Sequence, residues 1–209
     1  MFNIEKDLTI RKANSNDNLE RISELIYYTD PYIYPYWFGT KENCAKILSK
    51  LILEDNFVFN INTIYIAINN QNNEIIGLSS IADKYTNFDY NYDKLFKDKN
   101  ATYTIKNYIF PMIDTIKNKG IATITNMCVK EEYRNQHIGY KLLKCVIEEY
   151  IKKNDNDIKY VEFDVLAHNP SAIKLYKNLG FMQISNIEKG FNGENMKKPE
   201  IIVMQLKIK

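Results

Sequence analysis

The stretch IATITNMCVKEEYRNQHIGYKLLKCVIEEY, residues 121–150, predicts a buried strand, a short polar turn and an amphipathic helix in immediate succession. The strand occupies residues 121–129, which are rich in β-branched side chains and follow Gly120. Apolar side chains then recur on one face at the helical spacing of about 3.6 residues, at Ile138, Leu142, Leu143, Val146, Ile147 and Tyr150. The rest of the chain is organised around this strand–turn–helix unit.

The turn inside this unit, residues 134–139, has the properties of an anion site. The first turn of a helix leaves several backbone N–H groups without partners and carries the positive end of the helix dipole. A strand that turns tightly into such a helix therefore presents N–H groups to a ligand, and phosphate is the usual one.

The turn also carries a resemblance to a known family. The residues YRNQHIG at 133–139 resemble the acyl-CoA pyrophosphate loop of the GNAT superfamily of N-acetyltransferases. That loop has Arg or Gln, two residues, Gly, one residue, then Gly or Ala. Arg134 and Gly139 match this pattern, whereas His137 stands where the family usually has glycine.

A second signature follows in residues 167–181, AHNPSAIKLYKNLGF. It is similar to the family pattern of an Asn, an Ala three residues on, a Tyr seven residues on and a closing Gly-Phe. The matching residues are Asn169, Ala172, Tyr176, Gly180 and Phe181. Two signatures in the expected order and separation make a stronger case than either alone.

Composition indicates an ordinary globular chain. Its 209 residues, 45% of them hydrophobic, can bury one substantial core, so residues 1–209 are expected to form a single domain. The net charge of +2 and the absence of a basic stripe argue against nucleic acid as a partner. No stretch has the length and apolarity of a membrane span or of a signal core, so we expect a cytoplasmic protein.

The cysteines give no sign of a metal site. Cys44, Cys128 and Cys145 are scattered, without a C-x-x-C motif, and the chain has only two histidines. We therefore expect reduced, buried thiols and no metal.

Period-2 and helical patterns predict the remaining elements. We expect strands over residues 8–12, 63–69, 74–81, 159–165, 181–188 and 200–207. We expect helices over residues 19–26, 40–52 and 171–179, the first capped by Ser15 or Asp17 and the second by Thr40. Gly180 is expected to end the last helix, and Gly190 and Gly193 to lie in the loop of the last hairpin.

Two aromatic regions fall outside this pattern. Residues 30–39, DPYIYPYWFG, contain two prolines, and we predict a loop there. Residues 84–120 separate two strands by an unusually long connection, which we interpret as an insertion containing a helix over about 101–117.

The element order indicates a mixed α/β fold. It agrees with the central twisted, mostly antiparallel sheet of about seven strands, flanked by helices, that the resemblance implies. In that family the sheet has a V-shaped splay between its fourth and fifth strands, which admits the cofactor.

The resemblance implies transfer of an acetyl group from acetyl-CoA to a primary amine of a small molecule or peptide. Backbone groups of strand residues 127–129 would hold pantetheine, the loop and first helical turn would hold pyrophosphate, and an asparagine before the last helix would hydrogen-bond the cofactor. The residues implied are Met127, Cys128, Val129, Arg134, Asn135, Gln136, His137, Ile138, Gly139, Tyr140 and Asn169.

Tyr176 resembles the family's general acid, which donates a proton to the departing sulfur. It also lies on an apolar helical stripe, so a purely structural core role stays open. Asn169 could likewise be only an N-cap before Pro170.

The sequence does not identify the general base. Family members often place a glutamate near the positions of Thr125 or Asn126, and neither is a carboxylate here. Glu162 and Asp164 alternate with apolar residues on their strand and could act through water, although a solvated or structural role is the simpler interpretation.

Two other functions are compatible with a phosphate-binding turn. A non-catalytic acyl-CoA-binding module would suit the missing carboxylate and the altered loop glycine, whereas a nucleoside-triphosphate binder fails because no Lys-Ser/Thr follows the loop. We expect the aromatic loop, through Tyr34, Tyr36, Trp37 and Phe38, and the insertion over 84–120 to wall the acceptor pocket jointly. The alternative is that the insertion covers the core or makes a dimer contact. Either a monomer or a homodimer is compatible with the sequence.

Overall fold

The computed structural model describes residues 2–95, 105–106, 109, 112–114, 116–117, 120–153, 158–185, 188–189 and 200–208. One mixed sheet runs through the molecule in the order β1-β2-β3-β4-β5-β8-β6, with β7 also paired to β8. Its strands are β1 (Leu8–Lys12), β2 (Ile64–Asn69), β3 (Glu74–Asp83), β4 (Ile121–Val129), β5 (Tyr160–Leu166), β6 (Met182–Gln183), β7 (Glu188–Lys189) and β8 (Glu200–Lys207).

The expected seven-stranded, mostly antiparallel sheet is confirmed. The two-residue strands β6 and β7 pair with successive parts of β8, so together they take the place of the single strand expected over 181–188. Only β4 and β5 pair in parallel. The loop expected to hold Gly190 and Gly193 lies outside the described residues.

The sheet opens between β4 and β5. Their pairing is limited to three residue pairs, Ile121 with Tyr160, Ala122 with Val161 and Thr123 with Glu162. Beyond Thr123 the strands have no mutual register, whereas β4 stays paired with β3 up to Val129. The predicted splay between the fourth and fifth strands is therefore present, and it leaves one edge of β4 without a strand partner.

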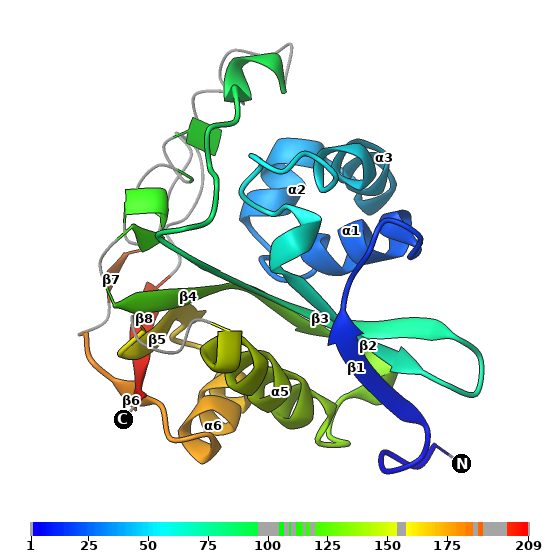
Figure 1. Ribbon diagram of the computed structural model, residues 1–209, viewed down its shortest axis with the longest axis vertical. Coiled ribbons are helices and arrows are strands. Elements are labelled where there is room, and N and C mark those ends of the chain that lie inside the picture. Colours follow the sequence, from blue (N-terminus) through cyan, green and yellow to red (C-terminus); the bar gives the residue numbers. More distant parts are fainter. Residues whose placement is uncertain are drawn as a thin grey trace.

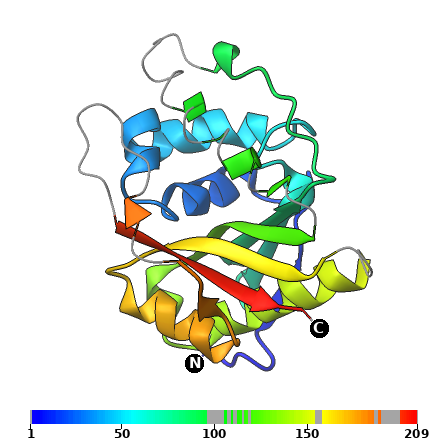
Figure 2. The ribbon, with the colours of Figure 1, turned by 90° about the vertical axis from the view of Figure 1, so that its left-hand side faces the viewer.

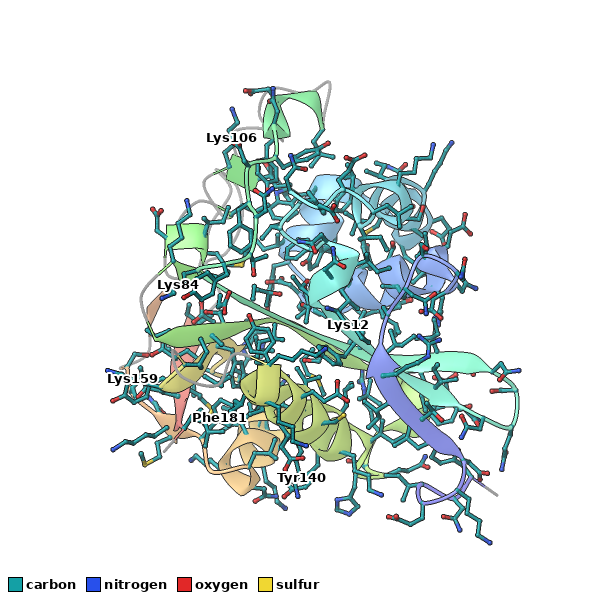
Figure 3. All side chains as sticks on the ribbon, in the orientation of Figure 1. Lys12, Lys84, Lys106, Tyr140, Lys159 and Phe181 are labelled. Atoms are coloured by element: carbon teal, nitrogen blue, oxygen red, sulfur yellow. The ribbon has the colours of Figure 1, made fainter. Side chains whose placement is uncertain are left out.

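Helices cover both faces of the sheet (Figure 1). On one face lie α1 (Leu19–Tyr27), α2 (Ile33–Phe38) and α3 (Lys41–Leu51), and on the other lie α5 (Ile138–Lys153) and α6 (Pro170–Asn178). Figure 2 shows β4, β5 and β8, in green, yellow and red, crossing between the two helical layers. In Figure 3, Tyr140 and Phe181 lie on the α5–α6 side, and Lys84 and Lys106 lie on the opposite side.

Each helical layer has its own core. The first core joins α1, α2 and α3 to one sheet face, and includes Ile22, Tyr34, Trp37, Leu48 and Cys128. The second joins α5 and α6 to the other face, and includes Leu142, Val146, Phe163, Tyr176 and Phe181. Successive side chains of a strand point to opposite faces of the sheet, so β4 and β5 each have side chains next to both helical layers.

The helix caps follow local chemistry. Thr40 accepts a hydrogen bond from the N–H of Asn43 at 3.2 Å, as the sequence predicted. The first helix is capped by Asn18, whose side chain accepts from the N–H of Arg21 at 2.9 Å, and not by Ser15 or Asp17. Asp17 is instead paired with Arg11, with 2.5 Å between the carboxylate and the guanidinium.

The expected loop around Pro35 is wrong, because residues Ile33–Phe38 form the helix α2. Pro35 is the third residue of this helix, where its missing N–H would have had no partner within the helix. Trp37 and Phe38 are consequently turned into the first core, at 6% and 3% exposure.

Part of the connection between β3 and β4 lies outside the described residues, including residues 96–104 and about half of the helix expected over 101–117. Its described residues include Ile105, Ile109, Ile113 and Ile116, which are helical and buried in the first core.

Candidate active site

A cavity of about 1410 Å³ lies where β4 and β5 separate. Its walls come from the end of α1 and the start of α2, from β4, from the turn into α5, from β5 and from α6. The two sequence signatures, more than thirty residues apart in the chain, therefore meet at one cavity. The residues expected from the sequence that line it are Tyr34, Met127, Cys128, Val129, Arg134, Asn135, His137, Ile138, Gly139, Tyr140, Asn169 and Tyr176.

The backbone of β4 directs polar groups into the gap. The N–H of Lys130 donates to the carbonyl of Ile76 at 2.8 Å, so the backbone N–H and C=O groups of Lys130 and of every second residue before it point toward β3. In an antiparallel pair the direction alternates, so the backbone groups of Met127 and Val129 face β5. The Val129 carbonyl accepts from Arg134 Nε at 3.0 Å, so the Met127 N–H and carbonyl are left for a ligand lying between the strands.

The strand β4 carries a bulge at Thr125. Ser80 is paired with Asn126 and Ile81 with Ile124, so Thr125 has no partner of its own on β3. The Thr125 and Ser80 hydroxyls lie 2.6 Å apart. The bulge re-aims the next side chain, Asn126, toward the α1–α2 face.

Asn126 is buried and fully hydrogen-bonded. Its Nδ2 donates to Thr29 Oγ1 and to the Tyr34 hydroxyl, both at 2.9 Å, and its Oδ1 accepts from Ser80 Oγ at 3.1 Å. These bonds join β3, β4 and the segment between α1 and α2 at the wall of the cavity. Asn126 therefore has a structural role in holding that segment against β4.

The turn into α5 forms a concave run of backbone N–H groups. Asn135 and His137 have φ values of 61° and 59°, so both are in the left-handed region. Asparagine and histidine tolerate this region better than most residues, and this explains how a loop with histidine in place of glycine keeps its shape. The first turn of α5 contains no acidic side chain, so nothing there competes with an anion.

Gly139 lies where the first turn of α5 approaches β4 and α6. A Cβ at this position would lie 3.2 Å from Leu175 Cδ2 and 3.4 Å from Met127 Cε. The 3.2 Å distance is shorter than an ordinary van der Waals contact of a Cβ atom. The absence of a side chain at this position therefore lets α5 lie close to β4 and α6. The glycine thus affects the width of the cavity, and it also leaves room for a ligand to approach the backbone of α5.

Tyr176 belongs both to the cavity and to the core. Its ring is 6% exposed and lies edge-on against Phe163, with 4.0 Å between ring centroids, and against Phe181 at 6.2 Å. Burial, with a smaller contribution from Cys128, raises the pKa of Tyr176, so the phenol stays protonated in neutral solution. The described residues offer its hydroxyl no hydrogen-bond partner, so it can donate a proton to a ligand.

Asn169 serves as the N-cap of α6. Its side chain accepts from the N–H of Ala172 at 3.1 Å. The capping interpretation is thus correct, and because Asn169 also lines the cavity, its amide Nδ2 is placed to meet a ligand there.

Charged side chains are segregated along the cavity. The basic side chains among the lining residues described are Arg134, His137 and Lys174, all on the signature segments. The carboxylates among them are Asp30, Glu162 and Asp164, which lie on the α1–α2 connection and on β5. One part of the cavity thus suits a polyanion and another suits a cation.

Asp30 was not predicted from the sequence. It lies between α1 and α2, and its Oδ1 accepts from the N–H groups of Tyr32 at 2.7 Å and Ile33 at 2.9 Å. Burial raises the pKa of Asp30, while these two hydrogen bonds oppose the shift. The sequence Asp30-Pro31 indicated only the start of a loop.

Four predicted residues do not line the cavity. Gln136 turns back and donates from Nε2 to the Glu132 carbonyl at 3.2 Å, so only its backbone can serve a ligand. The expected aromatic wall is wrong apart from Tyr34. Trp37 and Phe38 lie in the first core because α2 is a helix, and Tyr36 is 39% exposed away from the cavity.

No three His, Cys, Asp or Glu side chains are grouped to hold a metal ion in the described part of the chain. The same residues include no helix that is long and apolar enough to cross a membrane. Cys44 and Cys128 are buried free thiols, and Cys145 is a half-buried one.

Comparison with known proteins gives the same family that the signatures resemble. Residues 33–181 match the family described as the acetyltransferase (GNAT) family. An N-acetyltransferase from Staphylococcus aureus Mu50 superposes with a TM-score of 0.63 at 18% identity, covering 95% of this chain and 100% of that one. At this identity the superposition shows a common fold.

Two curated relatives align with part of the chain. The [ribosomal protein bS18]-alanine N-acetyltransferase of Escherichia coli K12 is 31% identical over 87 residues, 42% of this chain and 56% of that protein. The spermine/spermidine N(1)-acetyltransferase of Bacillus subtilis is 28% identical over 93 residues, 44% of this chain and 59% of that protein. The chain thus spans a little over half the length of each relative.

Proposed function

The chain belongs to the acetyltransferase (GNAT) family, and on that premise we propose that it transfers the acetyl group of acetyl-CoA to a primary amine. One observation carries the proposal. A single cavity passes between β4 and β5, with the phosphate-binding type of turn and cationic groups in one part and carboxylates in another. A donor with a pyrophosphate and an acceptor with an ammonium group would fit these two parts.

The turn and the start of α5 would bind the pyrophosphate. The N–H groups of Ile138, Gly139 and Tyr140 are in the first turn of the helix and have no helical acceptor. Arg134 and Lys174 add positive charge at the cavity wall. The bound anion would be held mainly by backbone groups, so the side chains of the turn can vary.

The edge of β4 would bind the rest of the donor. The Met127 N–H and carbonyl face the gap left by β5, so they can hydrogen-bond the pantetheine amides and the acyl oxygen. Asn169 would contribute its amide from the start of α6. Direct attack by the amine in a ternary complex then needs no covalent intermediate on the protein.

Tyr176 would act as the general acid. The amine nitrogen attacks the thioester carbonyl carbon, the carbon–sulfur bond breaks, and the sulfur takes the proton of the Tyr176 hydroxyl. Its raised pKa keeps that proton in place until the sulfur accepts it.

The acceptor is a primary amine of a small molecule or of a peptide. The two curated relatives are named for one acceptor of each kind, a ribosomal protein alanine and a polyamine. The carboxylates Asp30, Glu162 and Asp164 supply the negative charge that would attract an ammonium group. We also propose one domain over residues 1–209, with residues 84–120 inserted, and a cytoplasmic location.

Ligand-induced stabilisation tests the proposal. Acetyl-CoA at a hundred times its dissociation constant is expected to add about 2.7 kcal/mol to the free energy of unfolding, while ATP and NAD add nothing. Thermal denaturation with each ligand measures this. A panel of amines with acetyl-CoA, read by thiol release, then separates the enzyme from a non-catalytic acyl-CoA-binding module, which would be stabilised without releasing thiol.

The loop histidine gives a second test. Glycine at position 137 fits the φ of 59°, so we expect His137→Gly to keep acetyl-CoA affinity close to that of the wild type. A β-branched residue is strained in this region by about 1–3 kcal/mol, so His137→Val should weaken binding by about tenfold to a hundredfold. Isothermal titration calorimetry of both variants measures this difference. Equal affinities for the valine and glycine variants would show that binding does not depend on this backbone conformation.

A further inference from the structure

The family's common position for a catalytic carboxylate is filled here by a residue that cannot take up a proton. Asn126 uses both N–H groups and its oxygen in hydrogen bonds to Thr29, Tyr34 and Ser80. Its neighbour Thr125 is 2.6 Å from the Ser80 hydroxyl. The acceptor amine would enter as an ammonium ion, so another group has to remove its proton.

The same hydrogen bonds bring a carboxylate close to this position. Asn126 binds Thr29, and Asp30 is the next residue in the chain, at a Cα–Cα distance of about 3.8 Å. The bond from Asn126 to the Tyr34 hydroxyl holds the other end of the same segment. The segment that carries Asp30 is therefore held against β4 at Asn126, and Asp30 lines the same cavity as Met127.

The Asp30 carboxylate is fixed through one of its oxygens. Two backbone N–H groups hold Oδ1, which fixes the orientation of the side chain. Among the described residues Oδ2 has no hydrogen-bond partner, so it is available to a ligand or a water molecule in the cavity. Burial raises the pKa of this carboxyl group above its ordinary value, although the two backbone hydrogen bonds oppose the shift, and a raised pKa makes the carboxylate a stronger base.

The other two carboxylates of the cavity are less suited to this role. The Glu162 carboxylate accepts a hydrogen bond from the Gln205 amide, from the strand beside it. Asp164 is exposed to solvent, so its surroundings do not fix its position as those of Asp30 do. Asp30 is half-buried, is held by two backbone N–H groups and follows Thr29, the residue that binds Asn126.

We propose that Asp30 is the general base, taking a proton from the acceptor ammonium directly or through one water. This proposal rests on the proposed acetyl transfer. The ammonium nitrogen gives one proton to Asp30 and attacks the thioester carbon with its freed electron pair. When the carbon–sulfur bond breaks, Tyr176 protonates the sulfur, and the second proton lost by nitrogen restores Tyr176 through water. Asp30 then releases its proton to solvent, so one proton is released per turnover.

Other titratable groups near Asp30 bear on the pH dependence. From its own segment come the phenols of Tyr28 and Tyr34, and from β5 come Glu162 and Asp164. His168, in the loop before α6, lies 3.5 Å from the Tyr32 hydroxyl, measured from Nε2. The test below therefore compares variants over a range of pH values and does not rely on one pH.

The test is Asp30→Asn, because the asparagine oxygen can still accept from the N–H groups of Tyr32 and Ile33 but cannot take up the proton. We expect an unchanged melting temperature and acetyl-CoA affinity, and a fall of at least tenfold in kcat/KM for the amine at pH 7. As the pH is raised, the wild-type kcat/KM should reach a plateau at a pH below the amine pKa of about 10. The kcat/KM of the variant should instead rise about tenfold per pH unit until the pH reaches the amine pKa. The second variant, Asp30→Ala, also removes the hydrogen bonds from the Tyr32 and Ile33 N–H groups and separates a folding defect from a catalytic one.

Each outcome is decisive. An active wild type with the same pH profile as Asp30→Asn overturns the role of Asp30 and leaves acetyl transfer intact. A steadily rising profile in Asp164→Asn, with a wild-type profile in Asp30→Asn, would assign the base to Asp164. A wild type that releases no thiol with any amine overturns acetyl transfer and the Asp30 proposal together.

Discussion

Replacing Gly139 with glutamate is expected to lower the affinity for acetyl-CoA by about three orders of magnitude. A glutamate side chain would extend from the first turn of α5 into the part of the cavity that also holds Arg134 and His137. A charge about 4 Å from one phosphate charge costs about 4 kcal/mol at an effective dielectric constant of 20, equivalent to about 10³-fold in affinity.

The structure supplies the matched control for this variant. In Gly139→Ala the new methyl group meets only the ends of two flexible side chains, Leu175 and Met127. We therefore expect the alanine variant to fold and to lose far less affinity than the glutamate variant. Isothermal titration calorimetry, with a melting curve for each variant, measures both effects. Wild-type affinity in a folded Gly139→Glu protein would place the pyrophosphate elsewhere.

The second large effect is expected from Tyr176→Phe. Phenylalanine preserves the edge-on contact with Phe163 and the packing against Phe181, so only the proton donor is lost. General acids contribute about 10²–10⁴-fold, and because a thiolate is a good leaving group we expect a loss near 10²-fold in kcat. The Michaelis constant for acetyl-CoA should change much less. Steady-state kinetics from thiol release measures both constants.

Tyr65→Phe is the control for removing a buried phenol. Tyr65 lies in the same core as Tyr176 but does not line the cavity. Its variant is expected to turn over like the wild type. If Tyr176→Phe also keeps wild-type kcat, Tyr176 is a core residue only and the proton reaches the sulfur from water.

Much of the fold was predictable from local patterns. The strand β4 has the predicted bounds, and α5 begins at Ile138, since β-branched alternation and helical spacing are carried by adjacent residues. Thr40 caps its helix because a threonine side chain can reach the N–H three residues on. The presence of His137, where the family usually has glycine, was also interpretable from the sequence, because the tolerance of a positive φ is a property of the residue type.

Local patterns failed where a neighbouring segment decides the outcome. Two prolines predicted a loop over 30–39. Pro35, however, lies in the first turn of α2, where a backbone N–H has no acceptor within the helix and its absence costs no hydrogen bond. That helix turns Trp37 into the core and away from the cavity. Which face an aromatic side chain takes depends on the packing of α2 against the sheet, and the sequence of the segment does not contain this information.

The residues of the functional site likewise fall into those predictable from the sequence and those placed only by the tertiary structure. The sequence by itself determined the signature residues of the donor site, because a phosphate-binding turn is built from the backbone of one short segment. Only the tertiary structure placed Asp30 beside β4, through the hydrogen bonds of Asn126 to Thr29 and Tyr34 across 97 and 92 residues of chain. Only the structure showed that Gly139 is needed for contact with Leu175 and Met127. Contacts between distant segments depend on how the sheet and both helical layers fold together, so no single stretch of sequence encodes them.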